Sequence, residues 1–280
     1  MKNSEEIKQV VREKYSEIAQ QSKTQNASSC CGVGGCNTVD YTIFSDDYSQ
    51  LAGYHEGADL GLGCGLPTEF AQIKTNDTVV DLGSGAGNDC FVARSLTGPA
   101  GTVIGIDMTQ AMIVKARENA SKLGFDNVQF RLGDIEDLPL QNNIADVVVS
   151  NCVMNLVPDK SKAFAETYRI LKPGGHFSIS DVVLEGALPL GLQQAAEMYA
   201  GCVSGALQKT NYLDIIQQAG FTNISIQKQK SVVIPDEILL EYITKDQLNE
   251  FKNSQTGIFS ITVYAEKPKA NCCAPNSGCC

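Results

Sequence analysis

The stretch Val79-Val80-Asp81-Leu82-Gly83-Ser84-Gly85-Ala86-Gly87 decides the fold, because it places a glycine-rich turn directly after an apolar strand and before a helix. Glycine at such a turn lets the backbone approach a ligand closely. A second acidic residue, Asp107, ends the next apolar run, where a carboxylate can hydrogen-bond the hydroxyls of a ribose. Asn88 stands where a dinucleotide fingerprint has its last glycine, and this departure favours a nucleoside ligand over a pyrophosphate.

From Thr78 onward, short β-rich runs alternate with helical patterns, which is typical of a parallel sheet with crossover helices. The predicted strands are residues 78–82, 102–107, 128–132, 145–150, 176–184, 224–227 and 258–266. The predicted helices between them are residues 88–96, 110–123 and 160–171, the last ended by Lys172-Pro173-Gly174-Gly175. We therefore expect an α/β, Rossmann-like fold: a seven-stranded, mostly parallel sheet with helices on both faces.

Segments that do not follow this alternation of strands and helices are expected to be additions to the core. Residues 1–45 combine an amphipathic helix over Met1 to Gln20 with a loop that contains several cysteines. Residues 46–187 form the predicted cofactor-binding core, and residues 188–268 a smaller C-terminal lobe that provides the acceptor side, with inserted helices at 188–207 and 235–251. Residues 269–280 are a cysteine-rich tail without apolar periodicity, which we expect to be disordered unless it binds a metal.

The 280-residue chain has a formal net charge of −10 and a pI near 4.7. This charge argues against a basic surface for nucleic acid or an anionic membrane, so the predicted substrate is small or neutral. Met1 to Gln20 lacks the apolar core of a signal peptide, and no run of about 18 apolar residues predicts a transmembrane helix. A cytoplasmic location without nucleic-acid or membrane partners is expected.

Residues 75–185 resemble the class I methyltransferases. In that family the glycine turn holds the amino-acid end of S-adenosylmethionine, the acid after the second strand holds ribose, and an acidic segment after the third strand holds adenine. The residue after the fourth strand lines the methyl site. The resemblance implies S-adenosylmethionine as the cofactor and the following candidate binding residues: Asp81, Gly83, Ser84, Gly85, Gly87, Asp107, Met108, Gly133, Asp134, Ile135 and Asn151.

The acceptor side offers few bases and many thiols. His55 and His176 are the only histidines, so the general base that O- and N-methyltransferases often need is weakly supported. His55 could reach a site, whereas His176 reads as a packing or surface residue. Eleven cysteines in a reducing compartment indicate thiol chemistry or metal binding rather than structural disulfides.

Three of the cysteines could meet over the cofactor cleft. Cys64 lies in a loop, expected to be flexible, ahead of the first strand, Cys152 follows the fourth strand, and Cys202 lies in an inserted helix. The first and fourth strands are neighbours in such sheets, with their carboxyl ends over the cleft. Three thiols suit one soft, three-coordinate ion, although each cysteine taken singly is more typical of a buried apolar position.

The surroundings of these cysteines resemble the arsenite methyltransferase family. The matching stretches are residues 54–65, 150–156 and 201–206, and the likeness covers most of Glu5 to Leu207. The resemblance implies that Cys64, Cys152 and Cys202 bind As(III). Trivalent arsenic keeps a lone pair that can attack a sulfonium methyl group directly, so this acceptor needs no general base.

The same resemblance implies a redox role for a further N-terminal cysteine. That role falls on Cys30, Cys31 or Cys36, of which Cys31 is our candidate, with thioredoxin or glutathione as the reductant. The terminal pairs Cys272-Cys273 and Cys279-Cys280 fit arsenite delivery and binding of other soft metals equally well.

Two other functions share parts of this pattern. A methyltransferase that acts on another small molecule, such as a quinone or a phenol, would have the same pattern of cofactor-binding residues. A binder that sequesters metalloids keeps the thiols without catalysis, but the intact glycine turn argues against it.

Overall fold

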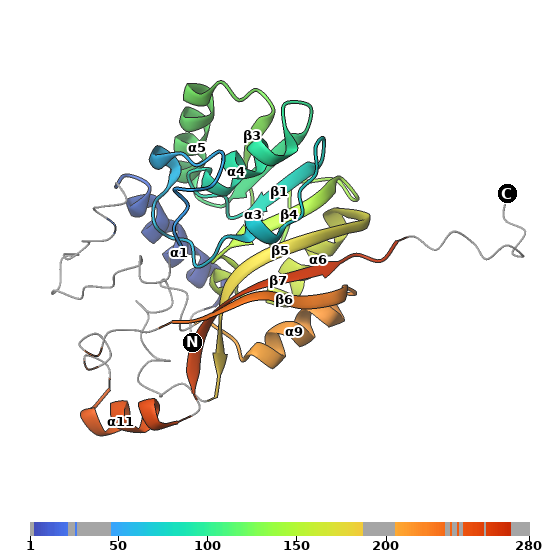
Figure 1. Cartoon of the computed structure of the whole chain (residues 1–280). Helices are drawn as coiled ribbons and strands as arrows, with labels where there is room; N and C mark the ends of the chain where they lie inside the picture. Colours follow the sequence, from blue (N-terminus) through green and yellow to red (C-terminus); the bar gives the residue numbers. More distant parts are fainter. Residues whose placement is uncertain are drawn as a thin grey trace, which may run out of the picture.

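The computed structural model describes residues 3–21, 26, 46–186, 205–232, 236, 240, 243–254 and 256–269. Its centre is a seven-stranded sheet with the order β3-β2-β1-β4-β5-β7-β6 (Figure 1). Every strand pair from β3 to β5 is parallel, and β7 runs antiparallel to both β5 and β6. The mostly parallel, Rossmann-like sheet expected from the sequence is confirmed. Its strands are β1 (Thr78–Leu82), β2 (Thr102–Asp107), β3 (Val128–Leu132), β4 (Ala145–Asn151), β5 (Leu171–Glu185), β6 (Thr222–Ser231) and β7 (Gly257–Glu266).

Successive side chains of the central strands supply two separate cores. Val79 and Val103 pack in one cluster with residues of α4 (Asn88–Thr97) and α5 (Gln110–Leu123). Val80 and Ile104 point to the opposite face and pack with α6 (Lys160–Ile170) and α9 (Lys209–Gln218). Helices therefore cover both faces of the sheet (Figure 1), and strands buried on both faces read as continuous apolar runs.

The N-terminal helix α1 spans Ser4–Ile18 and confirms the predicted amphipathic helix. Asn3 and Glu6 form a capping box, in which each side chain accepts a hydrogen bond from the other residue's backbone N–H. Val11 and Ile18 are buried, and the helix contacts α5. None of the described helices is long and apolar enough to cross a membrane.

Two element boundaries differ from the sequence prediction around the Lys172-Pro173-Gly174-Gly175 segment. Helix α6 ends at Ile170 rather than at residue 171, and β5 begins at once at Leu171. The register of β4 with β5 shifts between Ala145 and Val147, so the segment is an irregular start of the strand. Proline and glycine mark a bulge here as well as a helix end.

The C-terminal lobe differs more. A single helix over residues 235–251 is wrong: Leu240 lies in a turn, and α11 (Lys245–Asn253) begins only after Thr244, whose capping box with Gln247 starts a new helix. Helix α9 was not predicted. The predicted helix at 188–207 lies outside the described residues except for its last three, which are not helical. The short helices α3 (Pro67–Phe70), η2 (Glu56–Ala58) and η3 (Met154–Leu156) complete the described elements.

Candidate functional site

A pocket opens over the carboxyl ends of β1, β2 and β4, where the strand order reverses and open α/β sheets bind their ligands. It encloses about 1040 Å³, part of which is open to solvent. Eight of the candidate cofactor residues line it: Gly83, Ser84, Gly85, Asp107, Met108, Asp134, Ile135 and Asn151.

The turn after β1 has the features of a surface that receives a ligand. Gly85 has a φ of +50°, and a Cβ added to it would meet nothing within 4 Å, so its backbone faces open space. Ser84 Oγ and Asn88 Oδ1 are buried and lack a protein hydrogen-bond partner. Buried polar atoms are normally satisfied, so both mark positions where a polar ligand belongs.

Asp107 is held in place at the end of β2. Its carboxylate accepts hydrogen bonds from the backbone N–H groups of Gly85, at 3.0 Å, and Thr109, at 2.8 Å. Burial raises the pKa of Asp107, and these two hydrogen bonds oppose that rise. The carboxylate keeps acceptor capacity toward the pocket, which suits the ribose role predicted from the sequence.

The other three candidate cofactor residues do not line the pocket. Asp81 is buried in β1 and accepts a hydrogen bond from Cys90 Sγ at 3.2 Å, and burial raises its pKa well above the usual range. A Cβ on Gly87 would meet the Phe130 ring at 2.8 Å, and one on Gly133 would meet Pro139 at 2.6 Å. These residues shape the site through packing behind its surface.

Helix α1 forms a wall of the pocket that sequence reasoning missed. Its residue Lys8 lines the pocket with an exposed fraction of 7%, and Nζ lies 2.6 Å from carboxylate oxygens of both Asp134 and Glu136. Asp134 also caps its own turn by accepting from the N–H of Glu136. The N-terminal helix therefore fixes the orientation of the predicted adenine-side carboxylate.

Lys8→Met is expected to lower the free energy of unfolding by about 3 kcal/mol, because it leaves the buried carboxylate of Glu136 without its charged partner. Urea unfolding followed by circular dichroism measures the change. Gln9→Met on the exposed side of the same helix is the matched control. Equal stability of the two variants would show that the ion pairs contribute nothing.

A second feature without a sequence signal is a buried network around Asn151, at the end of β4. Its Oδ1 accepts from the N–H of Cys64 at 3.0 Å, and its Nδ2 donates to the carbonyl of Gly65 at 2.8 Å and to the hydroxyl of Tyr48. Tyr48 in turn donates to Asp89 at 2.9 Å. One amide thus joins the wall of the pocket to the segment that carries Cys64.

Asp89 gives this network a pH dependence. Burial raises its pKa to about 6, although hydrogen bonds from Tyr48 and Asn151 lower it. The folded state then binds the proton more tightly than the unfolded state, so this group favours folding at low pH and loses that contribution as pH rises through about 6. We expect wild type to lose about 2 kcal/mol relative to Asp89→Asn between pH 4 and 7, measured by urea unfolding. A pH-independent difference would refute this assignment.

Cys64 and Cys152 meet where this network reaches the pocket. Cys64 is fully buried, and its segment is held by Asn151 and by a hydrogen bond from Ser260 Oγ to its carbonyl. Cys152 lines the pocket, has an unusual φ of +59°, and donates its N–H to the carbonyl of Ser180 at 2.8 Å. Both are thiols outside any disulfide. The expected meeting of these two cysteines is thus observed.

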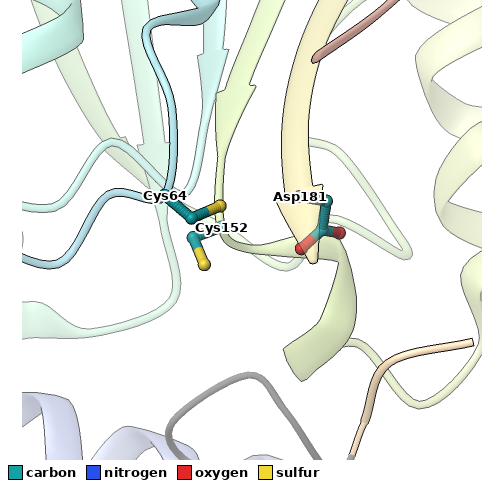
Figure 2. Close-up of side chains that lie close together, drawn as sticks. All are labelled: Cys64, Cys152 and Asp181. Carbon is teal, nitrogen blue, oxygen red and sulfur yellow. The ribbon is translucent and has the colours of Figure 1, made fainter. Parts of the chain in front are cut away.

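A carboxylate completes this group. The two Sγ atoms and one carboxylate oxygen of Asp181 all lie within 4.8 Å of one another (Figure 2), the only such cluster of possible ligands within the described part of the chain. Burial raises the pKa of Asp181 to about 7, opposed by the hydrogen bond from Val182 N–H and by the charge of Lys160. Cys202, Cys31, Cys30 and Cys36 lie outside the described residues.

The two histidines are engaged elsewhere. His55 Nδ1 accepts from the N–H of Gly57 at 3.1 Å and caps η2. His176 Nε2 lies 2.6 Å from the carbonyl of Ala71, and its ring packs on Tyr264. Neither lines the pocket, so this geometry gives no support to a histidine base.

Comparison with known proteins places this chain in a family. Residues 73–220 match the model of a methyltransferase domain family. An arsenite methyltransferase of Halobacterium salinarum is 40% identical to the chain over an alignment 280 residues long. The alignment covers 95% of this chain and 68% of that protein. The chain belongs to the arsenite methyltransferase family. The human arsenite methyltransferase is 34% identical over 80% of this chain and 64% of its own length, so the chain spans about two thirds of the length of these family members.

A solved structure of the family has the same fold. An arsenic(III) S-adenosylmethionine methyltransferase from Chlamydomonas reinhardtii matches with a TM-score of 0.64 and 34% identity, covering 74% of this chain and 68% of that one. The class I methyltransferase fold expected from the sequence is confirmed, and the chain is a methyltransferase of the arsenite methyltransferase family.

Proposed function

We propose that this protein transfers the methyl group of S-adenosylmethionine to trivalent arsenic held by cysteine thiols. The proposal is carried by the position of Cys152, which lines the pocket over the carboxyl ends of β1, β2 and β4. Its sulfur also lies within 4.8 Å of the sulfur of Cys64. The sulfurs that would bind the arsenic therefore lie beside the surface of the pocket that would bind the cofactor. The names of the relatives from Halobacterium salinarum and Chlamydomonas reinhardtii support the same activity.

The residues of the pocket fit S-adenosylmethionine. Asp107 would hold the ribose, Asp134 and Ile135 the adenine, and the turn of Gly83, Ser84 and Gly85 the amino-acid end. Ser84 Oγ and Asn88 Oδ1 provide the unsatisfied polar atoms that a charged amino-acid group needs. When bound, the cofactor supplies an electrophilic methyl group on a sulfonium.

The acceptor site fits arsenite through ligand exchange. Each thiol replaces one arsenic hydroxyl: an S–As bond forms, an As–O bond breaks, and the thiol proton leaves with the hydroxyl as water. Cys64 and Cys152 supply two sulfurs, and we assign the third to Cys202. Soft sulfur ligands suit arsenic better than carboxylate or amide oxygen. Holding the arsenic lone pair beside the methyl group supplies much of the rate acceleration.

Turnover requires a reductant. Methylation takes arsenic from the trivalent to the pentavalent state, and two thiols return the two electrons by forming a disulfide. We assign this step to an N-terminal cysteine, with Cys31 as the candidate, and the renewal of the thiols to thioredoxin or glutathione. Such a cycle requires a reducing compartment, in agreement with the cytoplasmic location expected from the sequence.

The test is an incubation of the full chain with S-adenosylmethionine, a thiol reductant and arsenite, with arsenic species separated by chromatography and detected by mass spectrometry. We expect methylated arsenic and an equal amount of S-adenosylhomocysteine. Parallel incubations replace arsenite with a phenol or a quinone. Product formation from those acceptors but not from arsenite would establish the rival methyltransferase, and arsenite binding without S-adenosylhomocysteine would establish a sequestering protein.

A further inference from the structure

Asp181 is a buried acid that the methylation scheme above does not use. It lies within β5, is fully buried, and presents one carboxylate oxygen to the sulfurs of Cys64 and Cys152 within 4.8 Å (Figure 2). The sulfur of Cys64 points toward this carboxylate in the figure. An arsenic atom bound to both sulfurs would therefore lie next to a carboxylate.

The hydrogen bonds that hold Asp181 come from neutral donors. Its Oδ1 accepts from the N–H of Val182 at 2.9 Å, and its Oδ2 accepts from the hydroxyl of Tyr212 at 3.4 Å. Tyr212 is itself fully buried, so the carboxyl group is fixed from behind by packed residues. These contacts orient the carboxyl group, and the charge of Lys160 favours its ionised form. A positive partner beside the two sulfurs would stabilise the buried carboxylate further.

The chemistry of the proposed reaction creates such a partner. The arsenic lone pair forms the As–C bond while the C–S bond of the sulfonium breaks, and the bonding pair remains on sulfur as a neutral thioether. No proton or further electron moves in this step. The positive charge therefore passes from the sulfonium to an arsenic atom that carries three thiolates and one methyl group.

We propose that Asp181 is a catalytic residue whose carboxylate stabilises the positive charge that develops on arsenic during methyl transfer. This inference rests on the proposed function, because it needs arsenic at Cys64 and Cys152. A fixed charge in a water-poor site costs no reorganisation when the reacting charge appears, which makes such stabilisation large. Neutral thiolate-bound arsenite gains little from the same carboxylate, so the effect falls on the transition state rather than on binding.

The experiment compares wild type with Asp181→Asn, which keeps the shape of the side chain and removes the charge. The single-turnover rate of S-adenosylhomocysteine formation is measured with enzyme in excess, so that later reduction and product release do not contribute. Equilibrium dialysis with arsenic quantified by mass spectrometry gives arsenite affinity in the absence of S-adenosylmethionine. We expect the rate to fall on the order of 10²-fold, as for removal of one transition-state electrostatic contact. Arsenite affinity should change by less than about threefold, because the ground-state ligand is neutral.

Two further variants separate charge from folding. Asp146→Asn removes the same charge at the opposite end of β4, where the carboxylate binds Lys172 and the N–H of Thr78, and should leave the rate unchanged. Asp181→Glu keeps the charge but displaces it, and should retain more activity than Asp181→Asn.

An unchanged rate in Asp181→Asn, or a rate loss matched by an equal loss of arsenite affinity or of thermal stability, would overturn the inference. A wild-type protein that forms no methylated arsenic would instead defeat the proposed function.

Discussion

Cys152→Ser is expected to reduce arsenite-dependent formation of S-adenosylhomocysteine by at least about 10³-fold, because the arsenic loses the ligand that holds it beside the methyl group. Serine keeps the size of the side chain and supplies a hard oxygen, which suits arsenic poorly. The backbone N–H of this residue bonds to the carbonyl of Ser180 and is untouched by the change. The measurement is kcat/KM for arsenite with the reductant in excess.

Cys90→Ser is the matched control for this variant. Cys90 is also a fully buried thiol, but it lies in α4, donates to Asp81 and does not line the pocket. Serine can keep that hydrogen bond, so activity should be close to wild type. Binding of S-adenosylmethionine to Cys152→Ser, measured by calorimetry, should also be retained. Full activity in Cys152→Ser would remove the thiol site from the mechanism.

Gly83→Ala is expected to weaken S-adenosylmethionine binding by at least about tenfold, because displacement of a binding turn by about 1 Å commonly costs this much or more. Gly83 has a φ of +73°, and an added Cβ would lie 2.6 Å from Cγ1 of Val153 and closer still to Cγ2. Val153 follows Cys152, so relief of the clash must move the cofactor turn, the acceptor residue or both. Titration calorimetry with S-adenosylmethionine measures the loss.

Two variants isolate the clash from the strained backbone. Gly124→Ala has a similar φ of +66° at the end of α5 but meets nothing within 4 Å, so it reports the cost of the left-handed backbone alone, about 1 kcal/mol. Val153→Ala in the Gly83→Ala background removes the clashing methyl groups and should restore binding. If Gly83→Ala binds as tightly as wild type, the contact with Val153 does not control the turn.

The sheet and the cofactor turn were largely predictable because their signals are local. Strands β1, β2 and β4 are buried on both faces, so each reads as a short, mainly apolar run that contains a glycine or an acid. Helix α9 was missed for the converse reason. No side chain caps its N-terminus, so no local signal in the sequence marks where this helix begins.

The site was predictable in part. The proximity of Cys64 and Cys152 followed from sheet topology and family resemblance. Asp181 and Lys8, in contrast, are single charged residues that come together with residues distant in sequence. The one signal for Asp181 was an acid within a mostly apolar run, Ile179 to Leu184, because a buried strand rarely carries an unpaired charge. The pairing of Lys8 with Glu136 spans 128 positions and had no local signal.

At Cys152, a left-handed backbone conformation that costs stability occurs at the same residue as a thiol that the proposed reaction needs. A residue with a side chain is strained at a φ of +59°, and glycine would relieve that strain. The substitution that relieves this strain therefore removes the sulfur, together with the packing of a buried side chain. The strained backbone at this position is therefore kept together with the thiol that the proposed reaction uses.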